Sequence, residues 1–213
     1  MIVILAFFFW LGYIFNLGVF QSQRIHCFRN THKMSLETKK REYQRAFAKA
    51  EASLKSNEIE TLSSETPSLN ELRYSGQHFA HAIICELDNN IAEAESHIDQ
   101  ATRHCKRAFY DAKESLFLNL MKQIHDFQAE YKEIVVSDVI NEFAGHRRKL
   151  KEIQKEYGEV VIKALERHNR DLYIDEIEKN IPAIEEILFD WENRRDELNR
   201  KKIEYYELKA RIR

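Results

Sequence analysis

The sequence predicts an all-α fold, an antiparallel helical bundle or coiled coil of about four to five long helices, preceded in one interpretation by an N-terminal transmembrane helix. Only 5 of the 213 residues are Gly and 2 are Pro, so few positions favour the turns that sheet folds require. Charged residues make up 32% of the chain, as is typical of long helices with one solvent-exposed face. The 44% of hydrophobic residues give these helices an apolar face to bury, which argues against a disordered chain.

Residues 1–20 contain no charged side chain and are about as long as a helix that spans a bilayer. The segment 21–34 is basic and free of acidic residues, so the positive-inside rule places the rest of the chain in the cytoplasm, at the cytoplasmic membrane. In the alternative interpretation, translation starts at Met34, residues 1–33 are a spurious extension, and the protein is soluble and cytoplasmic. A cleaved secretory signal is disfavoured, because the segment has neither a basic start nor a small-residue cleavage site.

Three segments follow this N-terminal region. A helix is expected at 35–56, and a linker rich in Asn, Ser and Thr at 57–66. Pro67 suits the first position of the next helix, because its ring fixes φ and it has no N–H to satisfy. The run Asp-Asn-Asn at 88–90 favours a tight reversal, so residues 67–131 are expected to form an antiparallel helical hairpin.

The second helix of this hairpin carries two different apolar seams. Its first part, from Ile91 to Ala112, repeats small or apolar residues at spacings of three and four, and small side chains let a neighbouring helix approach closely. Its second part, from Leu116 to Tyr131, repeats large apolar residues at the same spacings. The neighbouring helix is therefore expected to change, or to move away, between the two parts.

Residues 137–213 carry the strongest heptad pattern in the chain. Ser137 is the expected N-cap of the first helix in this region. Apolar residues then alternate at spacings of three and four up to Ala164, and again from Ile174 to Leu198. Such seams need a covering surface, so we expect a protein partner or a second copy of the chain to bind through the heptad faces.

Several familiar catalytic and binding motifs are absent from the sequence. It has no Gly-rich phosphate loop, no Gly-x-Ser-x-Gly, no His-Glu-x-x-His and no EF-hand loop. Of 33 basic residues three precede residue 35, so the body carries 30 basic against 35 acidic side chains, and this argues against a general nucleic-acid coat. The three cysteines form no Cys-x-x-Cys pair, which fits a reduced, cytosolic setting.

Arg73 and His78 are the candidate catalytic pair. The motif Arg73-Tyr-Ser-Gly-Gln-His78 resembles the spacing that HEPN-type helical ribonucleases use to present a cation and an acid/base to one phosphodiester. The resemblance covers these two positions and the helical fold class, and it implies an RNA-cleaving enzyme with Arg73 as the cation and His78 as the acid/base. The other interpretation is a helix surface on which His78 packs beside Leu72 and Tyr74.

Donor side chains for a metal occur on both helices of the hairpin. They are His78, His81 and Cys85 on the first helix and His97, His104 and Cys105 on the second. Antiparallel pairing leaves His104 roughly three turns from Cys85, and cysteines also suit a seam as small apolar residues. The sequence therefore predicts no metal site and no cofactor.

Two basic stretches are candidate binding sites for the phosphates of an RNA, a nucleotide or a lipid. Their residues are Arg103, Lys106 and Arg107 in one stretch and Arg147 and Arg148 in the other. Most such runs are solvated faces that pair with nearby acids, so nucleic-acid binding is the less favoured alternative. We expect a non-enzymatic helical interaction or scaffold protein, with a HEPN-like ribonuclease or a nucleic-acid- or nucleotide-binding accessory protein as alternatives.

Overall fold

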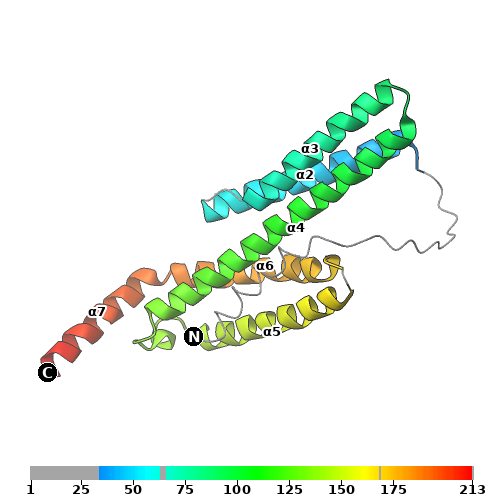
Figure 1. Ribbon diagram of the computed structural model, residues 1–213. Coiled ribbons are helices and arrows are strands. Elements are labelled where there is room, and N and C mark those ends of the chain that lie inside the picture. The colour runs from blue at the N-terminus through cyan, green and yellow to red at the C-terminus, as the bar shows by residue number, and fades with distance from the viewer. Residues whose placement is uncertain (1–33, 63–65, 168, 213) are drawn as a thin grey trace. The chain divides into compact units, whose positions relative to one another are not determined.

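The computed structural model describes residues 34–62, 66–167 and 169–212. Within them every regular element is a helix and no strand occurs, as the predicted all-α class requires (Figure 1). The elements are α2 (Leu36–Thr61), α3 (Thr66–Leu87), α4 (Ile91–Glu130), the 3₁₀ helix η1 (Val136–Asp138), α5 (Phe143–Arg167), α6 (Asp171–Glu192) and α7 (Arg195–Ile212).

The transmembrane prediction falls on residues 1–20, which, like all of 1–33, lie outside the described residues. Among the helices that the structure does describe, none combines the length and the apolar character needed to cross a bilayer. From Met34 onward the chain forms one compact unit by itself.

Helix α4, with 40 residues, is the element against which most of this unit packs. Helices α2 and α3 lie along its N-terminal half, and α6 lies along its C-terminal half together with α5 (Figure 1). The small-residue seam lies under α2 and α3, where the Asn57 side chain reaches the carbonyl of Ala112. The large seam lies under α5 and α6, where Phe117 packs on Tyr157 with ring centroids 4.7 Å apart. The predicted change of neighbour therefore occurs around Ala112, where contacts with α2 and with the start of α6 overlap.

Helix α2 extends further than the sequence predicts, because Asn57 belongs to the core. The helix begins after Ser35, whose hydroxyl accepts a hydrogen bond from the backbone N–H of Thr38 at 3.2 Å. Asn57 is completely buried, and its Nδ2 donates to the Ala112 carbonyl at 3.2 Å. Residues 57–61, predicted to begin a linker, are thus helical.

The hairpin turn and the entry to α5 follow from local backbone preferences. Asn89 adopts a φ of 56°, in the left-handed region that Asn tolerates better than most residues, and the chain reverses there. After α4 the predicted N-cap Ser137 lies instead within η1. Helix α5 begins only at Phe143, because Val136, Val139 and Ile140 are buried in a turn that precedes it.

The seams of α5 and α6 are covered within the chain. Trp191, on α6, is completely buried, with its ring centroid 4.8 Å from that of Phe127 on α4 and 5.1 Å from that of Phe143 on α5. Pro182 lies inside α6 without ending it. The helix ends after Glu192, and α7 starts from Arg195. The apolar seam residues of α6 up to Trp191 are therefore not available to another chain.

Arg170, in the turn before α6, joins the α5–α6 pair to the middle of α4. Its guanidinium lies 2.9 Å from the Asp111 carboxylate and 3.1 Å from that of Glu114. Burial raises the pKa of the Asp111 carboxyl, and the positive charge of Arg170 offsets part of that effect. Burial, with the nearby Glu114 carboxylate, also raises the pKa of Tyr173 to about 12.

Candidate functional site

Titratable side chains gather on one side of the α3–α4 hairpin. They are His78, His81 and Cys85 from α3 and Glu93, His97 and His104 from α4. Spacings of three, four and seven place each set along one helix face. The antiparallel turn then sets the late residues of α3 beside the early residues of α4. Cys85 therefore meets Glu93 and His97, and His78 meets His97 and His104.

Four histidine rings lie in a row between the two helices, which we call the histidine ladder (His81, His97, His78 and His104). The centroids of His81 and His97 are 5.4 Å apart, and those of His78 and His104 are 5.2 Å apart at an interplanar angle of 15°. The two halves join where His78 Nδ1 lies 3.2 Å from His97 Nδ1. At the far end Tyr74 packs on His104 at 5.7 Å.

The contact between His78 and His97 constrains their protonation. Two Nδ1 atoms at hydrogen-bond distance cannot both carry a hydrogen, so one ring must present a lone pair there. Burial lowers the pKa of His78, and the neighbouring His104, His97 and His81 lower it further, because each repels a second positive charge. The ladder therefore favours a neutral His78, and one of the two Nδ1 atoms donates a hydrogen bond to the other.

Glu71 fixes the last ring of the ladder. Its carboxylate lies 2.7 Å from Nδ1 of His104, and the two side chains are only 22% and 18% exposed. A carboxylate at this distance keeps a hydrogen on Nδ1 and holds the ring in one orientation. The sequence reasoning did not select Glu71, because an acid on a charged helix gives no local signal of a histidine partner.

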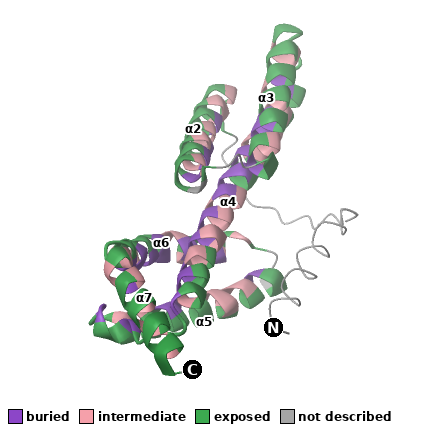
Figure 2. Ribbon diagram, turned by 90° about the vertical axis from the view of Figure 1, so that its left-hand side faces the viewer, coloured by how far each residue is buried: buried purple, intermediate pink, exposed green. Residues whose placement is uncertain are grey.

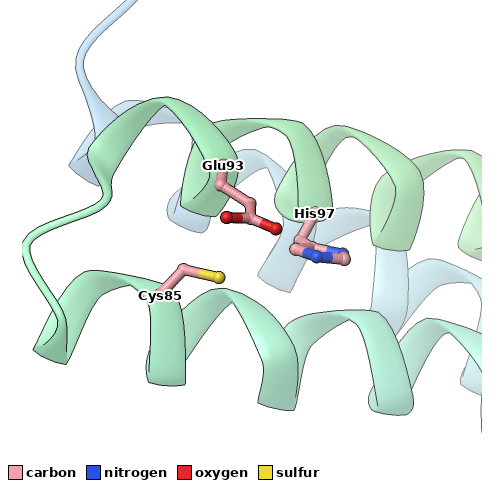
Figure 3. Close-up of side chains that lie close together, drawn as sticks. All are labelled: Cys85, Glu93 and His97. Atoms are coloured by element: carbon pink, nitrogen blue, oxygen red, sulfur yellow. The ribbon is translucent and has the colours of Figure 1, made fainter.

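At the other end of the ladder, Cys85, Glu93 and His97 come together (Figure 3). One donor atom from each, a thiol sulfur, a carboxylate oxygen and a ring nitrogen, lies within 4.8 Å of the other two. Figure 3 shows Cys85 on α3 facing the gap toward α4, which carries both Glu93 and His97. Burial raises the pKa of the Cys85 thiol, and the negative charges of Glu93 and Asp88 raise it further.

Arg73 and His78, the HEPN-like pair, are not brought together. Five residues along an α-helix rotate a side chain by about 140°, which puts the two on different faces of α3. The Arg73 guanidinium is exposed and lies 5.2 Å from the centroid of the Tyr74 ring, whereas His78 faces the rings on α4. The spacing along the chain suggested that Arg73 and His78 act together, but the helical geometry places them on different faces of α3.

The two basic stretches lie on different helices, one on α4 and the other on α5. Arg103, Lys106 and Arg107 are exposed on the N-terminal half of α4. Arg147 and Arg148 are exposed on α5, and Arg147 lines a hollow of about 100 Å³ with His125 of α4. Arg107 and His125 are 18 positions apart on one helix, which is roughly 27 Å, so the two stretches do not form one phosphate-binding surface.

Lys106 lies beside a second hollow of about 270 Å³ between α2, α4 and α6. Its charged lining consists of Lys49, Lys106, Asp171, Asp175 and Glu178. Three of these five are acids, and Lys49 already lies 3.9 Å from Glu178 and 3.8 Å from the centroid of the Phe109 ring. The hollow is smaller than most ligand pockets, and its acids oppose the binding of an anion.

No protein-family model, curated protein or solved structure matches this chain. The chemistry of the site is therefore argued from its own residues. Sequence reasoning had identified most of the donors of the hairpin but not Glu93. The signal that finds Glu93 is the hairpin register, since residues whose numbers add up to about 178, such as Cys85 and Glu93, face each other across the turn at 88–90.

Proposed function

We propose that this protein is a non-enzymatic helical interaction protein, and that it forms a homodimer through α7. One observation supports the proposal more than any other: the heptad series of α6 continues along α7 beyond the surface that the chain itself covers. An apolar residue occurs at every seventh position, in the series Ile177, Ile184, Trp191, Leu198, Tyr205 and Ile212. A series of this kind is typical of helices that pack on another helix over their whole length.

Burial along this series falls off within α7. Leu198 is completely buried and Tyr205 is half-buried, but Ile212 is 78% exposed. Leu208, which shares the face of Tyr205 and Ile212, is 59% exposed. Figure 2 shows the same gradient, with α7 exposed over most of its length. A partner would therefore cover the face of α7 beyond Leu198.

A second copy of α7 fits this face by its charge distribution. The first turn of α7 carries Asp196 and Glu197, and its last turn carries Lys209 and Arg211. In an antiparallel pair centred near Tyr205, the acidic start of each helix lies beside the basic end of the other. The same arrangement suits both helix dipoles. A homodimer of this kind has a two-fold axis and uses one surface twice.

We further propose that residues 1–20 tether this dimer to the cytoplasmic membrane, with the body in the cytoplasm. The support comes from the uncharged apolar sequence and from the basic residues that follow it. Fractionation of cells, with an alkaline wash of the membranes, tests the tether. Recovery of a chain that begins at Met34 from the soluble fraction would support the alternative start and contradict the tether.

Sedimentation equilibrium of the full chain, in a density-matched mild detergent, tests the dimer. Since α7 offers few apolar side chains, we expect a weak, reversible dimer with a Kd near or above the micromolar range. The apparent mass should rise from that of the monomer toward twice that value as the concentration increases. A constant monomer mass up to about 0.5 mM would contradict the proposal.

A further inference from the structure

We infer that Cys85, Glu93 and His97 form a binding site for a divalent transition metal ion, with Zn²⁺ as the best match. The inference is independent of the proposed dimer, because the site lies on the α3–α4 hairpin and α7 contributes nothing to it. It also goes against the sequence-based expectation that the chain has no metal site.

The chemical types of the three donors select the class of metal. A thiolate is a soft ligand, an imidazole is intermediate, and a carboxylate is hard, and zinc accepts all three types in proteins. Calcium and magnesium prefer an all-oxygen shell, which this set cannot offer. Among divalent ions, a mixed sulfur, nitrogen and oxygen set therefore favours zinc, or cobalt as its spectroscopic substitute.

The spacing of the donor atoms is close to what a tetrahedral ion requires. Zinc bonds of roughly 2.0–2.3 Å place neighbouring ligand atoms about 3.3–3.8 Å apart. The three donor atoms already lie within 4.8 Å of one another. Side-chain rotation that moves an atom by about 1 Å closes the difference. Glu93 is exposed, and the hydrogen bond that its carboxylate accepts from Asn90 Nδ2 at 2.5 Å lies at the surface, where water replaces it when the carboxylate turns.

The scaffold holds the ligands without help from a loop. Glu93 and His97 are separated by one helical turn on α4. Cys85 faces them from the last turn of α3, just before the hairpin turn. Helical bundles build metal sites from such pairs on facing helices. Beyond them, His78 Nδ1 lies 3.2 Å from His97 Nδ1, about the separation of two nitrogen ligands on one tetrahedral ion. The histidine ladder thus shares His97 with the proposed site.

Titration of the full, reduced chain with Co²⁺ is the first test. We expect one equivalent to bind and to produce a thiolate-to-cobalt charge-transfer absorption, since only a cysteine ligand gives that band. The band should disappear in Cys85→Ser. It should persist in Cys105→Ala and in Cys27→Ser, which serve as matched controls for the other two cysteines.

Competition with a chelator then measures the affinity for Zn²⁺. His97→Ala and Glu93→Gln should each weaken binding by about tenfold or more, as expected for the loss of one ligand. His125→Ala removes an exposed histidine on the same helix and should leave the affinity unchanged. Circular dichroism of each variant checks that the helices persist.

Two results would overturn the inference. One is the absence of stoichiometric metal binding to the reduced wild-type chain at micromolar concentrations. The other is binding whose affinity and cobalt spectrum are the same in wild type and in Cys85→Ser, which would assign the metal to the surface histidines alone. Neither result depends on the oligomeric state, so failure of this site is distinguishable from failure of the dimer.

Discussion

Leu198 is completely buried, whereas Ile212, two heptads further along the same helix, exposes 78% of its surface. The two residues occupy equivalent positions of one seven-residue series, so the difference between them lies in the covering surface and not in the sequence pattern. Around Leu198 the C-terminal end of α4 is close: the Tyr131 hydroxyl donates to Asn199 Oδ1 at 2.8 Å. Toward Ile212 the described contacts are polar, as between Lys209 and Glu133 at 3.9 Å.

Trp191→Ala should destabilise the chain more than truncation of Arg170, Phe189 or Lys122. The indole is completely buried between Phe127 and Phe143, and its Nε1 donates to His146 Nδ1 at 3.1 Å. Removing such a ring leaves a large cavity and costs about 3–5 kcal/mol. Urea unfolding followed by circular dichroism measures the loss. Phe189→Ala, at a ring that is 69% exposed on the same helix, should cost less than about 0.5 kcal/mol.

Arg170→Ala should cost about 1–2 kcal/mol, because it leaves Asp111 and Glu114 partly buried without their cation. The cost stays below that of a fully buried pair, since Arg170 is 40% exposed and water screens the charges. Lys122→Ala is the control, because it removes an exposed i,i+4 pair with Asp126. It should change the free energy of unfolding by less than about 0.5 kcal/mol. Equal losses in the two variants would contradict a role of Arg170 in fastening α5 and α6 to α4.

The loss caused by Arg170→Ala should depend on pH. Burial already raises the pKa of Asp111 above its usual 3.8, and removal of the guanidinium raises it further. When the pKa of Asp111 is higher in the folded state than in the unfolded state, the folded state binds more protons at pH values between these two pKa values. The stability of the variant therefore falls as pH rises through that interval, and the deficit is complete above it. Unfolding at about pH 4 and about pH 7 should show the smaller difference between variant and wild type at pH 4; equal differences would contradict the assignment.

Much of the fold was predictable because helical patterns are local. The change from small to large seam residues after Ala112 indicated a change of neighbour, and the Asp-Asn-Asn run indicated the hairpin turn. The helical state of the polar stretch that begins at Asn57 was less predictable. In the sequence, Asn57 looks like a residue of a linker, whereas in the structure its buried amide donates a hydrogen bond to the Ala112 carbonyl. Ser137 failed as an N-cap, because buried valines on both sides of it hold the chain in a turn.

The candidate site was predictable in its parts but not in its arrangement. The sequence places His78, His81 and Cys85 on one helix face, but which residues of α4 meet them depends on the number of residues in the turn. The observed register places Cys85 opposite Glu93, and it also brings His97 to the same site. In this register His104 lies further along the hairpin and pairs with Glu71. Conversely, Arg73 and His78 looked like a pair only because spacing was counted along the chain and not around the helix.

The oligomeric mass of Leu208→Glu/Ile212→Glu, compared with wild type, tests the central claim most directly. The control is Ile162→Glu/Leu165→Glu, which adds the same two charges at exposed apolar positions of α5. We expect sedimentation equilibrium to show a concentration-dependent dimer for wild type and for the control, and a monomer for the α7 variant, because buried carboxylates would face each other across the two-fold axis. An α7 variant that dimerises as well as the control does would contradict the account.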